Sequence, residues 1–332
     1  MRAVSCVAPG ELALIDIAPP VLEPGWVKVR VAHIGICGTD YHILEGTHPF
    51  LQYPRIMGHE LSGTVLDPNG SDLKVGTPVV INPYLPCYHC PACLEGKTNC
   101  CETLTVIGVH SDGGMTEEIV MPAANLSPAE GLSLRDAAMV EFLAIGAHAV
   151  RRAEVKPGNR VLVVGGGPIG LGVAFFAWIA GGEVALLDAA ADKREAAQGF
   201  GFMPVGLEDL ESPGFVAMKS SGFDAVFDAT GSIRAMNASI AHTRNGGSYT
   251  LVGVIKGDLV WSDPDVHRKE LTIRASRNAT KEDFDHVMDS IRKGLVPTER
   301  LATHATTLDN VTRDMPVWTY DRSGLIKAII TV

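Results

Sequence analysis

The segment that most constrains the fold is Gly-Gly-Gly-Pro-Ile-Gly at residues 165–170, which contains the pattern G-x-G-x-x-G. An apolar run at 161–164 precedes it, and an apolar helical segment follows. Glycine is needed there for a tight strand-to-helix turn, for close approach of a pyrophosphate, and for packing of the helix on the strand. The segment therefore predicts a dinucleotide site, with contacts at Gly165, Gly167, Pro168, Ile169 and Gly170.

The chain after residue 150 alternates strand patterns with helical patterns. Strands are expected at 161–164, 184–187, 223–227, 249–252 and 271–275, and helices at 192–200, 233–241 and 281–293. This alternation predicts a parallel, doubly wound α/β sheet with helices on both faces. The part before residue 150 instead carries short alternating patterns such as 27–31, broken by glycine and proline, so a β-rich domain is expected there.

Asp188 stands about twenty residues beyond the glycine turn, at the end of the next predicted strand. A carboxylate at that place accepts hydrogen bonds from the adenosine ribose and repels the 2'-phosphate of NADP, so the sequence predicts NAD as the cofactor. Alternatively, Asp188 only caps the following helix.

The cysteines are clustered: five of the seven lie between Cys87 and Cys101. Four of them follow the spacing C-x2-C-x2-C-x7-C, namely Cys87, Cys90, Cys93 and Cys101. Four thiolates at this spacing can close a tetrahedron around zinc, which predicts a structural zinc lobe at 87–101. Cys100 and His89 are expected to stand outside it. A redox role for these thiols is the alternative, but a redox pair needs no third and fourth cysteine.

The composition and net charge of the chain indicate which kinds of partner and which cellular location to expect. The 332-residue chain has a formal net charge of -10, which disfavours a nucleic-acid partner. No secretion signal opens the sequence, and the cysteines suit metal better than disulfides, so a cytoplasmic location is expected. The uncharged stretch between Arg160 and Glu183 is long enough for a membrane span, but its glycines favour a strand, a turn and a helix instead.

Two further motifs complete a family pattern: Cys-Gly-Thr-Asp-Tyr-His at 37–42 and Gly-His-Glu at 58–60. Together with the cysteine lobe and the glycine turn, and in this order, they resemble the zinc-containing medium-chain dehydrogenases along essentially the whole chain. The resemblance implies a GroES-like catalytic domain at 1–145 and 281–332, and a Rossmann NAD domain at 146–280.

The resemblance also implies roles around a catalytic zinc. Cys37 and His59 resemble its ligands, and the third ligand is either Glu141 or Glu60. Asp40 resembles the carboxylate that orients the zinc-bound histidine. Thr39 and His42 resemble the family's proton relay. The chain departs from the family at Phe142, where proline usually follows the glutamate, and this puts the local backbone in question. Alternatively, Glu141 is a carboxylate at a helix N-terminus.

Six more positions resemble cofactor contacts of the family. Lys193 resembles a residue that holds the adenosine ribose, and Lys327 one that approaches the pyrophosphate. The nicotinamide side would be lined by Thr230, Gly231, Val252 and Val254. Two zinc ions per chain and one NAD are therefore expected.

Several segments resemble in sequence the bacterial sugar-acid and polyol dehydrogenases, particularly those that oxidise L-galactonate or L-idonate. The expected reaction is hydride transfer from a secondary hydroxyl of such a small-molecule substrate to NAD, with Arg277 as a candidate partner for a substrate carboxylate. Threonine or a simple alcohol is an alternative substrate. A catalytically idle, NAD-sensing regulatory protein is an alternative function. The resemblance further implies a homodimer or homotetramer, paired through the strand at 271–275.

Overall fold

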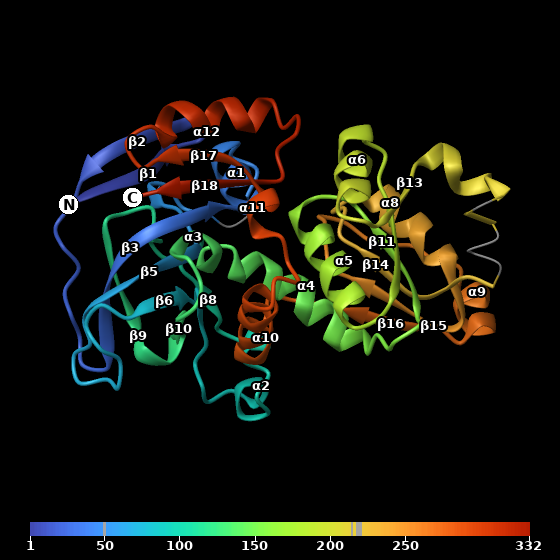
Figure 1. The fold of residues 1–332 in the computed structure, drawn as a ribbon, viewed down its shortest axis with the longest axis horizontal. Helices are drawn as coiled ribbons and strands as arrows, with labels where there is room; N and C mark the ends of the chain where they lie inside the picture. Colours follow the sequence, from blue (N-terminus) through green and yellow to red (C-terminus); the bar gives the residue numbers. More distant parts are fainter. Residues whose placement is uncertain (49–50, 214, 217–220) are drawn as a thin grey trace. The chain divides into compact units, whose positions relative to one another are not determined.

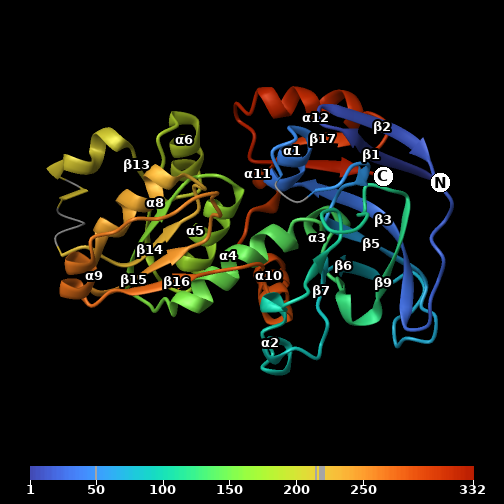
Figure 2. The same cartoon turned by 180° about the vertical axis from the view of Figure 1, so that it is seen from behind.

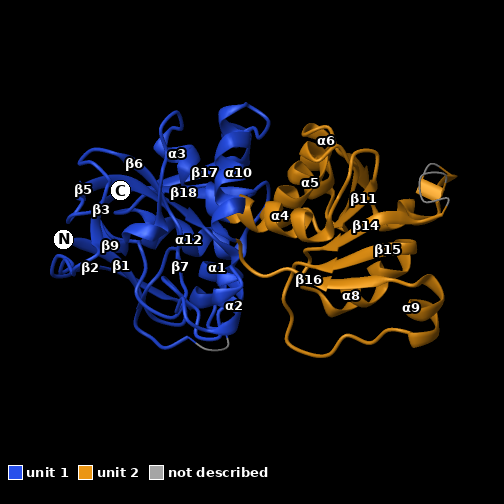
Figure 3. Cartoon of the chain, turned by 90° about the horizontal axis from the view of Figure 1, so that it is seen from below, with its two compact units in different colours: residues 1–141, 280–332 blue, residues 142–279 orange. Residues whose placement is uncertain are grey.

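The computed structural model describes residues 1–332 except 49–50, 214 and 217–220. The chain forms two compact units, which Figure 3 colours separately. Unit 1 comprises Met1–Glu141 and Thr280–Val332, and unit 2 comprises Phe142–Ala279. The sequence placed the divisions after residue 145 and before residue 281, within a few residues of those found.

Unit 1 is built on a seven-stranded sheet with the strand order β10-β6-β5-β3-β18-β17 and with β9 paired to β3 (Figures 1 and 2). Its strands are β3 (Trp26–Ile36), β5 (Glu60–Asp67), β6 (Pro78–Ile81), β9 (Glu118–Pro122), β10 (Leu126–Pro128), β17 (Ala302–Thr307) and β18 (Lys327–Thr331). Two smaller sheets contain β1 (Arg2–Ala8), β2 (Glu11–Asp16), β4 (Arg55–Ile56), β7 (Tyr84–Leu85) and β8 (Thr105–Val106). The predicted β-rich domain is confirmed.

The helices of unit 1 are short, apart from two in its C-terminal part. They are α1 (Gly38–Leu44), α2 (Pro91–Leu94), α3 (Leu134–Ala137), α10 (Lys281–Arg292), α11 (Thr298–Leu301) and α12 (Val311–Tyr320). The apolar stripe expected at 281–293 is buried on α10, which begins with a capping box formed by Thr280 and Asp283.

Strand β3 positions the centre of unit 1. Val27, Val29 and Val31 are buried as their alternation predicted, and the strand continues to Ile36. Strand β18, from the end of the chain, pairs antiparallel with β3 so that Ala328 lies opposite Ile36. This pairing places Lys327 next to the segment that carries Cys37.

Unit 2 is a six-stranded parallel sheet with the order β13-β12-β11-β14-β15-β16. Its strands are β11 (Arg160–Val164), β12 (Glu183–Leu187), β13 (Met203–Val205), β14 (Phe223–Asp228), β15 (Thr243–Leu251) and β16 (Thr272–Ala275). Its helices are α4 (Val140–Ala153, which starts in unit 1), α5 (Pro168–Ile179), α6 (Ala191–Gly199), α8 (Ile233–Ser239) and α9 (Asp263–Lys269). Figure 3 shows α4, α5 and α6 on one face and α8 and α9 on the other. The strand order reverses between β11 and β14, which is where such sheets bind ligands.

The glycine turn meets each requirement that its sequence implied. Gly165 has φ of +99°, a conformation that other residues rarely adopt. A Cβ on Gly170 would lie 1.7 Å from the carbonyl oxygen of Gly165, so only glycine lets α5 pack this closely on the turn. Gly167 faces open space, with no heavy atom within 4 Å of its Cβ position. The turn therefore packs tightly against α5 at Gly170, and it leaves open space at Gly167, where a ligand could approach.

The uncharged stretch between Arg160 and Glu183 divides into β11, the glycine turn and α5, as the sequence favoured. In the part of the chain that the structure describes, no helix is long and apolar enough to cross a membrane. Strand β13 and the helices α4 and α9 of unit 2 were not predicted.

Candidate functional site

A four-cysteine cluster lies in the loop between β7 and β8. The sulfur atoms of Cys87, Cys90, Cys93 and Cys101 all lie within 4.8 Å of one another. The Cys87 amide donates to Cys101 Sγ at 3.2 Å, and the Cys90 amide donates to Cys87 Sγ at 3.3 Å. Four converging thiols held by backbone amides suit a closed tetrahedral zinc site.

Hydrogen bonds favour the thiolate form at two of the four cysteines, whereas burial raises the pKa of Cys93 to about 12. The backbone amides of His89 and Cys90 lower the pKa of the Cys87 thiol to about 6, and the amide of Cys87 lowers the pKa of Cys101. Thiolates rather than thiols bind metal, so these hydrogen bonds prepare the cluster for zinc. Cys100 is exposed and stands outside the cluster, and His89 is exposed and lies 2.8 Å from the Cys87 carbonyl through its Nδ1.

A second cluster brings together residues from two separate segments of unit 1. Cys37 is the N-cap of α1, while His59 and Glu60 lie at the start of β5 after Gly58, which has φ of +91°. One ligand atom from each of Cys37, His59 and Glu60 lies within 4.8 Å of the others. A thiol, an imidazole and a carboxylate form a donor set that suits zinc, with fewer groups than a closed shell needs.

Unpartnered polar atoms support a cation at this second cluster. Among the described residues, His59 Nδ1 and Glu141 Oε2 are buried and have no hydrogen-bond partner. Buried polar groups are normally hydrogen-bonded, so such atoms call for an explanation, and a bound ion is one. Burial lowers the pKa of His59, but Asp40 and Cys37 outweigh it and hold the pKa well above its ordinary value. A divalent cation would take the place of that proton.

Glu60 is held on both of its oxygens. Lys327 Nζ donates to Glu60 Oε1 at 2.7 Å and to Oε2 at 2.8 Å, and also to the Ile36 carbonyl at 3.2 Å. Burial lowers the pKa of Lys327, but the Glu60 carboxylate outweighs it and raises the pKa, so the ammonium stays charged. Lys327 was expected to approach the pyrophosphate, whereas the structure places it in a buried ion pair beside Cys37.

Glu141 lies in the first turn of α4, and its side chain is buried. Tyr84 Oη donates to Glu141 Oε1. Burial raises the pKa of Glu141 to about 7, and burial with the Glu141 charge raises the pKa of Tyr84 well above its ordinary value, so the phenol is the donor. No sequence motif pointed to Tyr84. Phe142 is fully buried inside α4, so the helix forms without the family's proline.

Asp40 is completely buried beside the second cluster. Its carboxylate accepts from the Cys37 amide at 2.8 Å and from the Gly58 amide at 3.4 Å. It therefore ties together the two backbone segments that carry Cys37 and His59. Asp40 Oδ1 lies 3.9 Å from His59 Nδ1, which is near enough to attract a charged imidazole but too long for a hydrogen bond.

The predicted relay residues both lie on α1. Thr39 is half-buried and makes no direct hydrogen bond to His42 or to any other described residue. His42 is exposed, and its Nδ1 lies 3.3 Å from Glu45 Oε2. A carboxylate only accepts, so Nδ1 carries the hydrogen in neutral His42, and Nε2 is the nitrogen that can take a proton. Arg322 holds Glu45 from its other oxygen at 2.9 Å.

Unit 2 contains a cavity of about 760 Å³ at the carboxyl ends of β11, β12 and β14. Gly165, Gly167, Asp188 and Thr230, four of the predicted cofactor residues, line it. Pro168, Ile169 and Gly170 continue from the same turn into α5. Lys193 does not line the cavity, and its Nζ lies 3.6 Å from Asp192 Oδ2. The cavity matches the expected adenosine half of a dinucleotide.

Asp188 both shapes the cavity and lines it. Its Oδ2 accepts from the Gly166 amide at 2.6 Å, and its Oδ1 accepts from the Ala190 amide at 2.8 Å. Ala190 is the N-cap of α6, and Asp188 accepts from the amide of Ala190 itself and not from an amide of the first helical turn, so this contact is not the helix cap that was the alternative. Because each carboxylate oxygen has two lone pairs, these bonds leave room to accept from a ribose.

The expected nicotinamide-side residues lie where β14 and β15 end. Thr230 donates from its backbone and side chain to Asp228 Oδ1, at 3.0 and 2.6 Å. A Cβ on Gly253 would lie 2.6 Å from Gly231 N, so the two loops pack directly on each other. Val252 is buried and Val254 is exposed. The four positions are therefore brought together, although they are far apart in the sequence.

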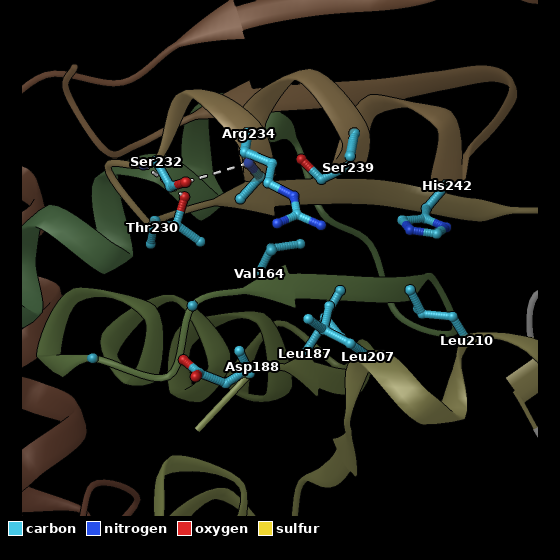
Figure 4. A pocket seen from close by; sticks show the side chains of 16 residues that line it. Val164, Leu187, Asp188, Leu207, Leu210, Thr230, Ser232, Arg234, Ser239 and His242 are labelled. Atoms are coloured by element: carbon cyan, nitrogen blue, oxygen red, sulfur yellow. Dashed lines mark hydrogen bonds between the residues drawn. The ribbon is translucent and has the colours of Figure 1, made fainter. Parts of the chain in front are cut away.

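Arg234 is a cavity residue that the sequence did not indicate. It projects from α8 into the cavity, from the wall opposite Asp188 (Figure 4). It forms no hydrogen bond or ion pair with any described residue. Leu207 and Leu210 form an apolar wall. A flat cation facing an apolar wall can enclose the ring of a nucleobase.

Comparisons with known proteins agree with this geometry. The family model for the alcohol dehydrogenase GroES-like domain matches residues 23–131, and the model for the zinc-binding dehydrogenase matches residues 168–293. The chain is 41% identical to L-galactonate-5-dehydrogenase of Escherichia coli K12, over 100% of this chain and 99% of that protein. It is 31% identical to the starvation-sensing protein RspB of the same strain, over 100% and 99%.

A solved structure is similar over the whole chain. The crystal structure of RspB from Escherichia coli CFT073, complexed with NADH, superposes with a TM-score of 0.93 at 29% identity, covering 100% of this chain and 99% of that one.

Replacing Arg234 with Ala should weaken adenine-nucleotide binding. Loss of a cation over the base costs about 0.5–2 kcal/mol, which is roughly a 2- to 30-fold rise in the dissociation constant of NADH and of ADP-ribose. Calorimetry or NADH fluorescence measures this, with Arg268→Ala on the exposed face of α9 as the control. An unchanged affinity for ADP-ribose would show that Arg234 does not face the base.

Proposed function

Because the chain belongs to the zinc-binding alcohol dehydrogenase family, as its motifs predicted, we propose that it oxidises a secondary hydroxyl of a sugar acid or polyol with NAD. The substrate would be of the L-galactonate or L-idonate kind. The observation that carries this proposal is the 41% identity to L-galactonate-5-dehydrogenase along the full chain, combined with the cluster of Cys37, His59 and Glu60.

The metal chemistry follows from the donor set. Cys37, His59 and one of Glu60 and Glu141 would hold the catalytic zinc. Bound zinc supplies a Lewis acid that lowers the pKa of the substrate alcohol, and NAD supplies the hydride acceptor. The four cysteines at 87–101 would hold a second, structural zinc, because they leave no open position.

The chain's own residues would handle the proton that the alcohol releases. Thr39 supplies a hydroxyl on the first turns of α1, and His42 stands at the exposed end of the relay with Nε2 free to accept. Glu45 fixes the ring by taking the Nδ1 hydrogen. Since no direct bond joins Thr39 to His42, a water molecule or a ligand hydroxyl would bridge them.

Asp188 supports NAD over NADP. Its carboxylate lines the adenosine cavity and would repel a 2'-phosphate. The nearby Arg194 guanidinium does not offset this charge toward the cavity, because it donates to the backbone carbonyls of Asp188 and Ala189 and to Glu208.

The direct test is NADH formation with L-galactonate, L-idonate, polyols, threonine and ethanol, with NAD or NADP and with or without a zinc chelator. We expect chelator-sensitive oxidation of a sugar acid or polyol, with NAD preferred. Turnover of threonine or ethanol alone would overturn the substrate class. No turnover from protein that carries both zinc ions would overturn the catalytic proposal.

A change of His42 to Gln should slow turnover mainly at low pH. When hydroxide is scarce the proton must leave through the relay, so the loss should be on the order of tenfold to a hundredfold below pH 7 and should shrink at higher pH. The pH-rate profile measures this, with the exposed His267→Gln as the control. A uniform loss at every pH would argue that His42 only supports the fold of α1.

A regulatory role is the second candidate, favoured by the 31% identity to a protein named as starvation-sensing. The presence of Cys37, Thr39, His42 and His59 argues against an idle site. The assay above separates the two, since a purely sensing protein would bind NADH without turnover.

We also infer a homodimer or homotetramer in the cytoplasm. Strand β16 stands at the edge of its sheet with three of its four residues exposed, and such an edge is a template for pairing. All seven cysteines are free, as expected in a reducing compartment. Light scattering should give a mass of two or four chains, and Ile273→Pro should lower it. A wild-type mass of 35.3 kDa would contradict the pairing.

A further inference from the structure

Two buried glutamates compete for the place of third zinc ligand, and the hydrogen bonds around them differ. Glu60 is fully buried and shares both of its oxygens with the Lys327 ammonium, at 2.7 and 2.8 Å. Glu141 shares only Oε1, with the Tyr84 hydroxyl, and its Oε2 has no partner among the described residues. Glu60 lies close to Cys37 and His59. Glu141, however, is the glutamate with a carboxylate oxygen that has no hydrogen-bond partner in the described part of the chain. A buried carboxylate oxygen without a partner is costly, so the unpartnered Oε2 points to Glu141 as the ligand.

We propose that Tyr84 is a positioning residue that holds Glu141 by one oxygen and directs the other to the catalytic zinc, while Lys327 keeps Glu60 off the metal. This inference rests on the proposed zinc chemistry and selects one ligand from the two that the sequence left open.

The surroundings of Tyr84 fit this role. The side chain is buried, and its ring packs edge-on against Phe284 of α10 with the ring centroids 6.2 Å apart. Tyr84 lies on β7, just before the four-cysteine loop, and its backbone amide donates to Asn82 Oδ1 while its carbonyl accepts from Asn125 Nδ2. The ring is therefore fixed from two sides. A fixed donor restricts the Glu141 carboxylate to one orientation, which is what a partner of a metal ligand does.

The ion pair between Glu60 and Lys327 explains why Glu60 is a poorer zinc ligand than Glu141. To bind zinc, a Glu60 oxygen would either have to leave the buried Lys327 ammonium or hold the metal ion directly beside that cation. Breaking a buried ion pair on one side leaves an uncompensated charge, which is strongly unfavourable. Glu141 Oε2 makes no hydrogen bond to any described residue, so it gives up none when it meets the metal.

The test compares the zinc affinity of purified holoprotein variants by competition with a chromophoric chelator. Tyr84→Phe should weaken binding of one of the two zinc ions about 10- to 100-fold, as is typical when a partner of a ligand is lost. The second zinc, in the four-cysteine lobe, serves as the internal reference. Tyr249→Phe is the control, because it also removes a buried hydroxyl, one that bonds to Ser239 and the Met236 carbonyl in unit 2.

A double-mutant cycle shows whether Tyr84 acts through Glu141. Glu141→Gln should weaken the same zinc at least as much, and adding Tyr84→Phe to it should cause no further loss. Glu60→Gln should cost less than Glu141→Gln. The spectrum of Co²⁺ placed in this site should change in Tyr84→Phe but not in Tyr249→Phe.

The outcomes separate this inference from the proposed function. If the wild type holds two zinc ions and Tyr84→Phe binds both as tightly, the role of Tyr84 is wrong and the function stands. The same holds if Tyr84→Phe causes its full loss in the Glu141→Gln background. A wild type that holds only the four-cysteine zinc would overturn both.

Discussion

The structure depends on an excess of buried negative charge at the centre of unit 1. The buried carboxylates of Asp40, Glu60 and Glu141 face the ammonium of Lys327 and the imidazole of His59, and the half-buried thiol of Cys37 lies beside them. Buried ions must be paired or bound to metal. Burial accordingly raises the pKa of both Asp40 and Glu141. A divalent cation at the proposed site would balance this charge.

The two proposed metal clusters are built differently, because one has a closed set of ligands and the other has an open position. All four ligand atoms of the four-cysteine lobe come from residues 87–101, because residues close together in the sequence are enough to close a small loop around a metal ion. The second cluster draws on the ends of β3, β5, β7, α4 and β18, because an incomplete shell must be held open by rigid elements around it. A sheet whose last strand, β18, returns beside β3 is what brings these groups together.

This difference decides how much could be predicted from the sequence. The cysteine lobe, the glycine turn and the strand before it are local patterns, and the structure reproduces them. Tyr84 and Arg234 were not predicted, because their roles arise from contacts with segments distant in the sequence. Lys327 was assigned to the pyrophosphate by resemblance, and only the β18–β3 pairing shows that it contacts Glu60. The choice between Glu60 and Glu141 stayed open for the same reason, since it depends on which carboxylate already has partners.

The most direct test of this account is X-ray absorption at the zinc edge of the purified wild-type protein. One closed four-sulfur site and one site with Cys37, His59 and a carboxylate predict an average of about 2.5 sulfur neighbours per zinc at about 2.3 Å, with about one to two nitrogen or oxygen neighbours at about 2.0–2.2 Å. A spectrum with sulfur neighbours alone, from a chain that holds a single zinc, would show that the buried charge at the second cluster is balanced without a metal.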